Sequence, residues 1–469
     1  MADIGHEPSA QPHPLRWRIL GLLGVAQLML ILDVTVVAIA LPHMETDLEL
    51  SRQAVTWTVS AYTLTFGGLM LLGGRTADLF GARRVVLAGL LVFTAASLAT
   101  GLAGSPAVLL GGRVAQGVGA AMLSPSALSF VVTLFQGDER NKALGVWSAL
   151  GGGGAALGVL LGGALTAGPG WPWVFFVNVP IGLVVFAALA RMLPRRAASA
   201  PRPRLDVLGA LLVTASSGAL IYALIRAGDD GWLDPGTGWP VLLAATGYLA
   251  FAARQRTAAS PMMDLSLLVR RPVATGTFLI VTATALMIAM FFLGTFYFQH
   301  ARGYGALRTG LLFLPIAVAT VAGADLTGRT IAAMGPRRLA VAGLVTTAAG
   351  MAVPAVSLHP VTVVVGTAIA GAGTGAMFVV ASATALGQVA PHESGIASGI
   401  VSTFHEFGAS VGAAVISSVA AASLTGDTLD GFAHGFVVAA ATAAVATLAA
   451  AVLTPPRPRR AAEPRPADA

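Results

Sequence analysis

The sequence predicts an all-α membrane protein with fourteen transmembrane helices, built as two six-helix halves around an inserted pair. Of the 469 residues, 56% are hydrophobic and only 10% are charged, whereas a soluble domain carries about 25% charged residues. Fourteen apolar segments each approach the roughly 20 residues that cross a bilayer as a helix. In addition, much of the charged segment 73–90 is repeated 254 residues later.

The fourteen predicted helices divide the chain into five regions. A disordered cytoplasmic tail (1–15) precedes an amino-terminal bundle (16–196), an inserted pair with its linker (197–260), a carboxy-terminal bundle (261–454) and a second cytoplasmic tail (455–469). The first apolar segment ends at Pro42 and is too long for the apolar region of a signal peptide, so we expect it to remain as a spanning helix. The predicted helices are 17–42, 54–73, 84–103, 107–134, 142–166, 174–193, 205–225, 239–254, 274–298, 308–331, 337–357, 361–388, 396–424 and 433–454.

The positions of the basic residues predict the orientation. If both termini are cytoplasmic, the loops on that side hold 23 of the 28 Lys and Arg residues, and the loops on the other side are acidic. Basic loops mark the cytoplasmic side of a membrane protein. An odd number of helices would place the two basic tails on opposite sides, so the even number is the consistent solution. The net charge of +7 therefore reflects membrane topology and gives no reason to expect nucleic acid as a partner.

The 254-residue offset extends beyond the charged segment. Residues 74–76 return at 328–330, and residues 81–84 return at 335–338 with proline in place of Ala82. Two glycines of the fourth helix, Gly117 and Gly119, correspond to glycines of the twelfth. Repeated matches at one offset indicate a duplication. Parallel repeats place a substrate site between the halves, near the middle of the membrane.

The charged segment and the fifth helix carry recognisable motifs. The charged segment follows the pattern Gly-x-Leu-Ala-Asp-Arg-x-Gly-Arg-Arg except at Thr76, Leu79 and Ala82, and its matching residues include Gly74, Asp78, Gly81, Arg83 and Arg84. The fifth helix has glycines at the spacing of a known antiporter motif, with Val159 in place of its proline: Gly145, Gly154, Gly158, Gly162 and Gly163. On these residues the chain resembles the major facilitator superfamily, specifically its fourteen-helix drug:proton antiporters.

The resemblance implies roles for both motifs. Asp78 and the neighbouring arginines would form a cytoplasmic latch that gates the transport cycle, and the glycines would allow the tight turn. The alternative is that these arginines only obey the positive-inside rule. The glycines of the fifth helix would flatten one face for close packing against the other half.

Three polar residues in the first and fourth helices are candidates for proton coupling. An aspartate inside a spanning helix, here Asp33, costs several kcal/mol and is by default a functional residue. At 1.5 Å per residue, Asp33 and Arg113 reach similar depths in a ~30 Å core. We therefore expect them to pair or to share a proton path, with Gln116 one helical turn from Arg113; the alternative is a static buried ion pair.

His405 and Glu406 lie about halfway along the thirteenth helix. Apolar burial favours the protonated form of a carboxyl group, so Glu406 is a candidate proton site or cationic-substrate site. The alternative is a polar contact between helices that never titrates. Asp325 and Arg329, in contrast, have the spacing of a surface pair on one helix.

These residues predict a proton-coupled secondary transporter that exports small amphipathic drugs, antibiotics or metabolites. The sequence has no cysteine and no ATP-binding motif, so we expect no cofactor and transport driven by the proton gradient. The expected partners are a small hydrophobic or cationic substrate, protons and membrane lipid, with the protein acting as a monomer. The alternatives are a metabolite or sugar importer of the same fold and a membrane sensor or enzyme without transport activity.

Overall fold

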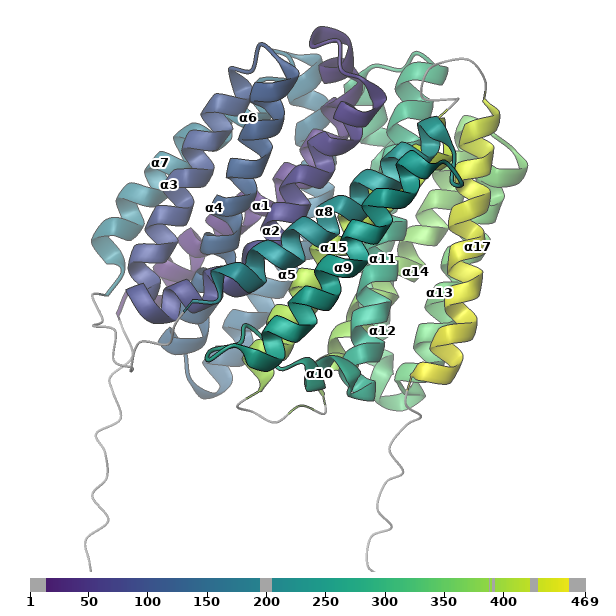
Figure 1. Cartoon of the computed structure of the whole chain (residues 1–469). Helices are drawn as coiled ribbons and strands as arrows, with labels where there is room; N and C mark the ends of the chain where they lie inside the picture. Colours follow the sequence, from purple (N-terminus) through teal and green to yellow (C-terminus); the bar gives the residue numbers. More distant parts are fainter. Residues whose placement is uncertain (1–13, 195–204, 388, 390–392, 422–428, 455–469) are drawn as a thin grey trace, which may run out of the picture.

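The computed structural model describes residues 14–194, 205–387, 389, 393–421 and 429–454. All regular elements in these ranges are helices (Figure 1). Nearly all of both predicted tails lies outside the described residues, as do residues 195–204, which include the predicted boundary between the amino-terminal bundle and the insertion. The helices are α1 (Arg16–Asp47), α2 (Arg52–Phe80), α3 (Ala82–Gly101), α4 (Pro106–Leu134), α5 (Gly137–Ala167), α6 (Trp173–Phe176), α7 (Asn178–Met192), α8 (Val207–Asp230), α9 (Pro235–Thr257), α10 (Leu265–Val269), α11 (Arg271–Phe296), the π-helix η1 (Tyr297–Ala301), α12 (Ala306–Met334), α13 (Pro336–Val356), α14 (Pro360–Leu386), α15 (Ser394–Val419) and α17 (Asp430–Leu453).

Within the described ranges, twelve helices are long and apolar enough to cross a membrane, where α6 with α7 and α11 with η1 each count as one. Two further long helices fall outside this set. These are α5, with 31 residues, and α9, with 23 residues and two arginines in its last turn. We call the end of the bundle where α1 begins and α17 ends the terminal end, and the opposite end the far end (Figure 1).

The two halves pack their helices in the same way. Gly117 of α4 lies against the carbonyl oxygen of Tyr62 in α2, and Gly371 of α14 lies against the carbonyl oxygen of Ile316 in α12. Both partners of the second pair are 254 residues beyond those of the first. A side chain at either glycine would collide with backbone, so the glycines let the helices approach closely. The contact that the duplication predicts is therefore present twice.

Residues 74–83, which the predicted helices leave as a loop, are helical except at Gly81. Helix α2 continues to Phe80 and α3 begins at Ala82, so Gly81 alone separates them, with φ at 89°. Gly335 joins α12 to α13 in the same way, with φ at 82°. Charged residues are good helix formers in water, so the helices extend beyond the apolar segment. A residue with such a positive φ is then needed to reverse the chain, and glycine adopts it without strain.

The first helix also extends further than predicted. Pro42 lies inside α1, which ends at Asp47. Proline lacks the N–H that would bond the preceding turn, but this cost is local and need not end a helix that is packed on neighbours. Leu41, Pro42 and Met44 are all buried, so packing holds the chain helical past the proline. The last turn brings Glu45 and Asp47 to the far end of the bundle.

The largest part of the apolar core that the two halves share lies at the far end. One large cluster mixes residues of both halves near the far end, among them Leu41 and Met44 of α1 with Phe292 and Phe296 of α11. Two other clusters belong to single halves: one is built from α1 to α7, and the other from α11 to α17. Two smaller clusters also join the halves along α2 and α15, with Leu71 near Ile400 and Leu64 near Ala414. The protein is therefore closed at the far end by a shared core.

Helices α8 and α9 lie together across α2 and α15, in front of them in Figure 1. At the terminal end Asp206 caps α8 and binds α9 by accepting hydrogen bonds from Arg254 (3.0 Å) and Gln255 (2.7 Å). At the far end Arg52 of α2 forms an ion pair with Asp229 of α8 (2.6 Å). Helix α8 thus covers the line along which α2 of one half meets α15 of the other, and α9 packs on α8.

Candidate functional site

The structure brings Asp33, Arg113 and Gln116 together in the interior of the amino-terminal half. Arg113 forms an ion pair with Asp33, and both side chains are at most 1% exposed. Gln116 donates to the other Asp33 oxygen (3.0 Å) and accepts from Arg113 (3.0 Å). Both carboxylate oxygens of Asp33 therefore have donors. Breaking such a buried pair leaves an uncompensated charge and costs about 3–5 kcal/mol.

Arg113 also connects α4 to α2. Its Nε donates to the backbone carbonyl of Thr58 (2.8 Å), and its guanidinium lies 4.4 Å from the ring centre of Tyr62. The remaining nitrogen, Nη2, is buried and has no hydrogen-bond partner among the described residues. A buried donor left unpaired is costly. Arg113 therefore has one unused donor in this state, while Asp33 is fully satisfied.

Glu406 is buried in α15 and faces α2. A Cβ added at Gly67 of α2 would lie 2.7 Å from the Cβ of Glu406 and 3.1 Å from the carbonyl oxygen of Thr403, so the glycine makes the room for this side chain. The carboxyl group makes no hydrogen bond or ion pair with any residue that the structure describes. His405, its neighbour, shares a hydrogen bond of 2.9 Å with Thr284 of α11 and points away from α2. The structure therefore separates the two residues that are adjacent in sequence.

A row of hydroxyl groups follows the contact between α2 and α15 on the far-end side of Glu406. Thr63 and Ser410 share a hydrogen bond of 2.6 Å, and Thr56 donates to Ser417 at 2.6 Å. The residue next to Thr63 is Tyr62, which contacts Arg113. Neighbouring residues of α2 thus contact α15 of the other half, through Thr63, and Arg113, through Tyr62. Sequence reasoning missed this row, although hydroxyl residues recur at helical spacing on α2 and could have indicated it.

The residues of the charged segment lie at the terminal end and are not paired as a latch. Asp78 is exposed and makes no hydrogen bond or ion pair with a described residue. Arg83 instead donates to the carbonyl oxygen of Ala190, near the end of α7 (2.6 Å), and Arg84 is exposed. Gly74 has only an ordinary contact with Pro125. In this state, therefore, Arg83 binds within its own half.

The motif glycines of α5 pack mainly against their own half, whereas the sequence prediction placed them against the other one. Gly154, Gly158 and Gly162 lie against α1, where added side chains would collide with Ile31, Thr35 and Val36. Gly163 alone lies against the other half, at the carbonyl oxygen of Ala306 in α12 (2.8 Å from an added Cβ), and Gly145 has no neighbour within 4 Å. The glycines therefore let α5 pack closely on α1 along Ile31, Thr35 and Val36.

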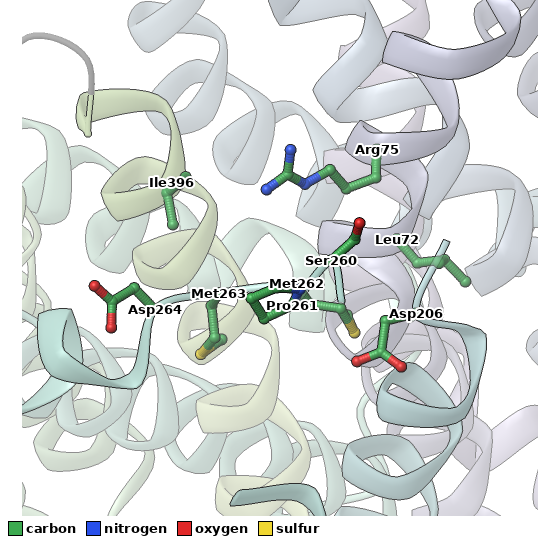
Figure 2. A pocket seen from close by; sticks show the side chains of 9 residues that line it. All are labelled: Leu72, Arg75, Asp206, Ser260, Pro261, Met262, Met263, Asp264 and Ile396. Carbon is green, nitrogen blue, oxygen red and sulfur yellow. The ribbon is translucent and has the colours of Figure 1, made fainter. Parts of the chain in front are cut away.

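A cavity of about 260 Å³ lies at the terminal end, between α2, the segment after α9 and the start of α15 (Figure 2). Its walls combine apolar side chains with Arg75, Asp206 and Asp264, and none of the predicted site residues lines it. Asp206 is already neutralised by Arg254, and Asp264 caps α10 by accepting from the Ser266 N–H (2.8 Å). The cavity is therefore separate from Asp33 and Glu406.

Comparison with known proteins agrees with this architecture. The sequence matches the family described as the Major Facilitator Superfamily over residues 23–332 and 317–469. It is 39% identical to the puromycin resistance protein pur8 of Streptomyces alboniger, over 94% of this chain and 91% of that protein. It is 36% identical to the cephamycin export protein CmcT of Amycolatopsis lactamdurans, over 92% and 90% of the two chains.

Among solved structures, the fold is similar to that of a bacterial homologue of the human lysosomal transporter Spinster. The TM-score is 0.67 at 16% identity, and the match covers 95% of this chain and 97% of that one. At this identity the likeness concerns the fold.

Proposed function

The chain belongs to the major facilitator superfamily, and we propose that it exports a small amphipathic antibiotic across the bacterial inner membrane in exchange for protons. It is a multi-pass inner-membrane transporter, not an enzyme, and its relatives are named as antibiotic resistance or export proteins. The observation that carries the proposal is that two carboxyl groups are buried at separate places, one inside the amino-terminal half and one where the two halves meet. Asp33 is paired with Arg113, whereas none of the described residues supplies a cation to Glu406.

Fourteen spanning helices with both termini in the cytoplasm complete the proposed topology. Support comes from α5 and α9, which are long helices beyond the twelve apolar ones, and from the 23 basic residues that would then face the cytoplasm. The terminal end is then cytoplasmic and the far end external. Because the shared core closes the far end, the structure corresponds to the inward-facing state of an alternating-access cycle.

In the proposed cycle, Asp33 is the coupling residue. A proton that arrives from outside neutralises Asp33, which weakens its attraction for Arg113 and frees the guanidinium to turn. Arg113 already has one unpaired nitrogen, so a second arrangement of this side chain is available to it. Release of the proton to the cytoplasm restores the pair and, with it, the affinity for substrate. Gln116 positions the Asp33 carboxylate through its hydrogen bond.

Glu406 is the second proposed site, for a proton or for a cationic group of the substrate. Its carboxyl group lies where α2 and α15 of opposite halves meet, so its charge affects both halves at once. An unpaired buried carboxylate favours either protonation or a bound cation. The hydroxyl row from Ser410 to Thr63 and the Tyr62 ring offer a polar route between this site and Arg113.

The charged segment is the proposed cytoplasmic latch. In a state closed at the cytoplasmic end, Asp78 would contact the other half, while Arg83 and Arg84 would hold the ends of α2 and α3 together. None of the described residues forms a hydrogen bond or ion pair with Asp78, which agrees with an open cytoplasmic end. The antiporter glycines of α5 would serve as a smooth surface on which α1 shifts during the cycle.

The proposal is tested by efflux from cells of an efflux-deficient host. Wild type should lower the susceptibility of the host to at least one antibiotic of a panel, and collapse of the pH gradient should abolish efflux. Asp33→Asn should lose coupled efflux. Glu406→Gln should lose efflux of cationic compounds and retain that of neutral ones if Glu406 binds substrate, or lose both if it carries the proton. Efflux that is unchanged without a pH gradient would refute the antiport mechanism.

A further inference from the structure

The far end of the bundle is closed by a polar contact between the halves, in addition to the shared apolar core. Gln299 of η1 donates from Nε2 to the backbone carbonyl of Ile39 in α1 (2.9 Å). η1 is a π-helix, a form that is rare and frequent at functional sites. Because its turn is wider than that of an α-helix, Gln299 and His300 both face α1.

Glu45 in the last turn of α1 lies at this contact. The distance from its Oε2 to His300 Nε2 is 3.6 Å, which is too long for a hydrogen bond. Oε2 is buried and has no hydrogen-bond donor among the described residues. Burying an ionised carboxylate without a donor is unfavourable, whereas a protonated carboxyl group carries no charge. Closing the far end therefore favours a Glu45–His300 pair that holds a proton.

The other charged groups around Glu45 are occupied or exposed. Asp47 accepts from Trp171 Nε1 (2.8 Å), and Arg302 donates to Tyr297 and to the Leu358 carbonyl. The charged or titratable groups near this end, on α1, on the elements packed against it and on the segments that follow them, are His43, Asp47, Glu49, Arg52, Tyr297, His300, Arg302, Tyr304 and Arg308. Arg52 is paired with Asp229, and Arg308 lies over the ring of Tyr304. Among the described residues, Glu45 thus has no arginine to neutralise it, and only histidines can share a proton with it.

We propose that Glu45, together with His300, is an external proton-binding site whose protonation allows the outer end of the transporter to close. The proposal rests on the proposed orientation and antiport function. When the outer end opens, water reaches Glu45 and stabilises its ionised form. The carboxylate must then take up a proton from outside before α1 and η1 can return to contact. The transporter thereby returns from its outward-facing to its inward-facing state only after a proton binds at Glu45, a site separate from Asp33 and Glu406.

The test measures distances between the halves without any substrate. The chain has no cysteine, so pairs of introduced cysteines can carry spin labels at chosen sites. Leu102 and Val356 are exposed, end α3 and α13 at the far end, and are related by the 254-residue offset. A second pair, Phe80 and Met334, is related in the same way at the terminal end and is also exposed. Distances are recorded in lipid nanodiscs between pH 5 and pH 8.5.

Lower pH should shorten the Leu102–Val356 distance and lengthen the Phe80–Met334 distance. For one proton, the ratio of closed to open outer end changes by at most about tenfold per pH unit. Glu45→Gln should keep the outer end closed up to pH 8.5, because the amide mimics the protonated acid, and Glu45→Ala should do the same if the amide variant folds poorly. Glu49→Gln, at an exposed acid four residues later, should respond like wild type.

Two results would overturn the proposal. One is a wild-type distance that does not change with pH. The other is a pH response that survives in both Glu45 variants and disappears in Asp33→Asn or Glu406→Gln, which would assign the response to those residues. An intact Glu45-dependent distance change in a protein that exports no tested drug would leave this site in place and reject the proposed export function instead.

Discussion

Gly67 of α2 and Glu406 of α15 lie in direct contact across the two halves, and a Cβ added at Gly67 would lie 2.7 Å from that of Glu406. The pair joins residues 339 positions apart in sequence. It places an uncompensated carboxyl group at a contact that alternating access must rearrange. The smallest possible change at residue 67 should therefore disturb both packing and transport.

Gly67→Ala is expected to reduce export strongly and to lower thermal stability. The added methyl group must displace Glu406 or the backbone at Thr403, and overpacking of this kind costs about 1–3 kcal/mol. Initial efflux rates and thermal unfolding in detergent measure the two effects. Gly21→Ala is the control: Gly21 is exposed on α1 with nothing within 4 Å, so this change should leave both unaffected. Wild-type efflux by Gly67→Ala would show that this contact does not matter for transport.

Arg113→Lys and Arg113→Gln are both expected to abolish proton-coupled export. Lysine has a single charged nitrogen and cannot reach Asp33, Gln116 and the Thr58 carbonyl in the geometry of a guanidinium. Arg113→Gln should also destabilise the fold by about 3–5 kcal/mol, because it leaves Asp33 charged and buried. Efflux rates and thermal unfolding are the measurements.

The double variant Asp33→Asn with Arg113→Gln separates stability from coupling. It should recover much of the lost stability, since no unpaired charge remains, and still fail to export. Equal coupled export by Arg113→Lys and wild type would contradict a dynamic role for the pair and favour a static one.

The sequence was sufficient to bring Asp33 and Arg113 together. Counting residues from each end of their helices placed them at one depth, and the structure places them in contact. The repeat offset likewise predicted equivalent packing, which Gly117 and Gly371 show. Both inferences depend only on helix geometry or on similarity within the chain.

Contacts between distant helices could not be predicted in this way. Nothing local in the sequence indicates that α2 meets α15, so the place of Glu406 against Gly67 and the hydroxyl row remained unforeseen. The ends of the helices also escaped prediction, because apolarity marks only the part of a helix in the membrane. The charged turns up to Gly81 and the turn after Pro42 extend into water or pack on neighbours.

Asp206→Asn is expected to loosen the inserted pair in a pH-dependent way. Burial alone would raise the pKa of Asp206, but hydrogen bonds from Arg254, the Gly209 N–H and Gln255 outweigh it and hold the pKa below its usual value of 3.8. A lowered pKa means that the stabilisation is complete above the ordinary value and disappears as pH falls through the value in the folded protein.

The measurement is thermal unfolding of wild type and Asp206→Asn at several pH values. Wild type should be the more stable at pH 7, and the difference should shrink below about pH 4. Asp230→Asn is the control: Asp230 forms an exposed pair with Arg226 within α8 (2.6 Å), and such pairs contribute about 0.5 kcal/mol or less. A difference that is independent of pH would mean that Asp206 acts by shape and not by charge.

Gly81→Ala and Gly335→Ala are expected to destabilise the protein by similar amounts. Both glycines form the single-residue turn between antiparallel helices, with φ at 89° and 82°. A residue with a Cβ is strained there by about 1–3 kcal/mol, and the strain should lower the melting temperature of each variant and more so of the double variant. Gly328→Ala is the matched control, because Gly328 lies within α12 with nothing within 4 Å, so an added methyl group meets open space and favours the helix by up to about 1 kcal/mol. If all three variants melt at the same temperature, the turns are not held by glycine, and the repeated Gly81 and Gly335 reflect descent from a duplication without a present structural need.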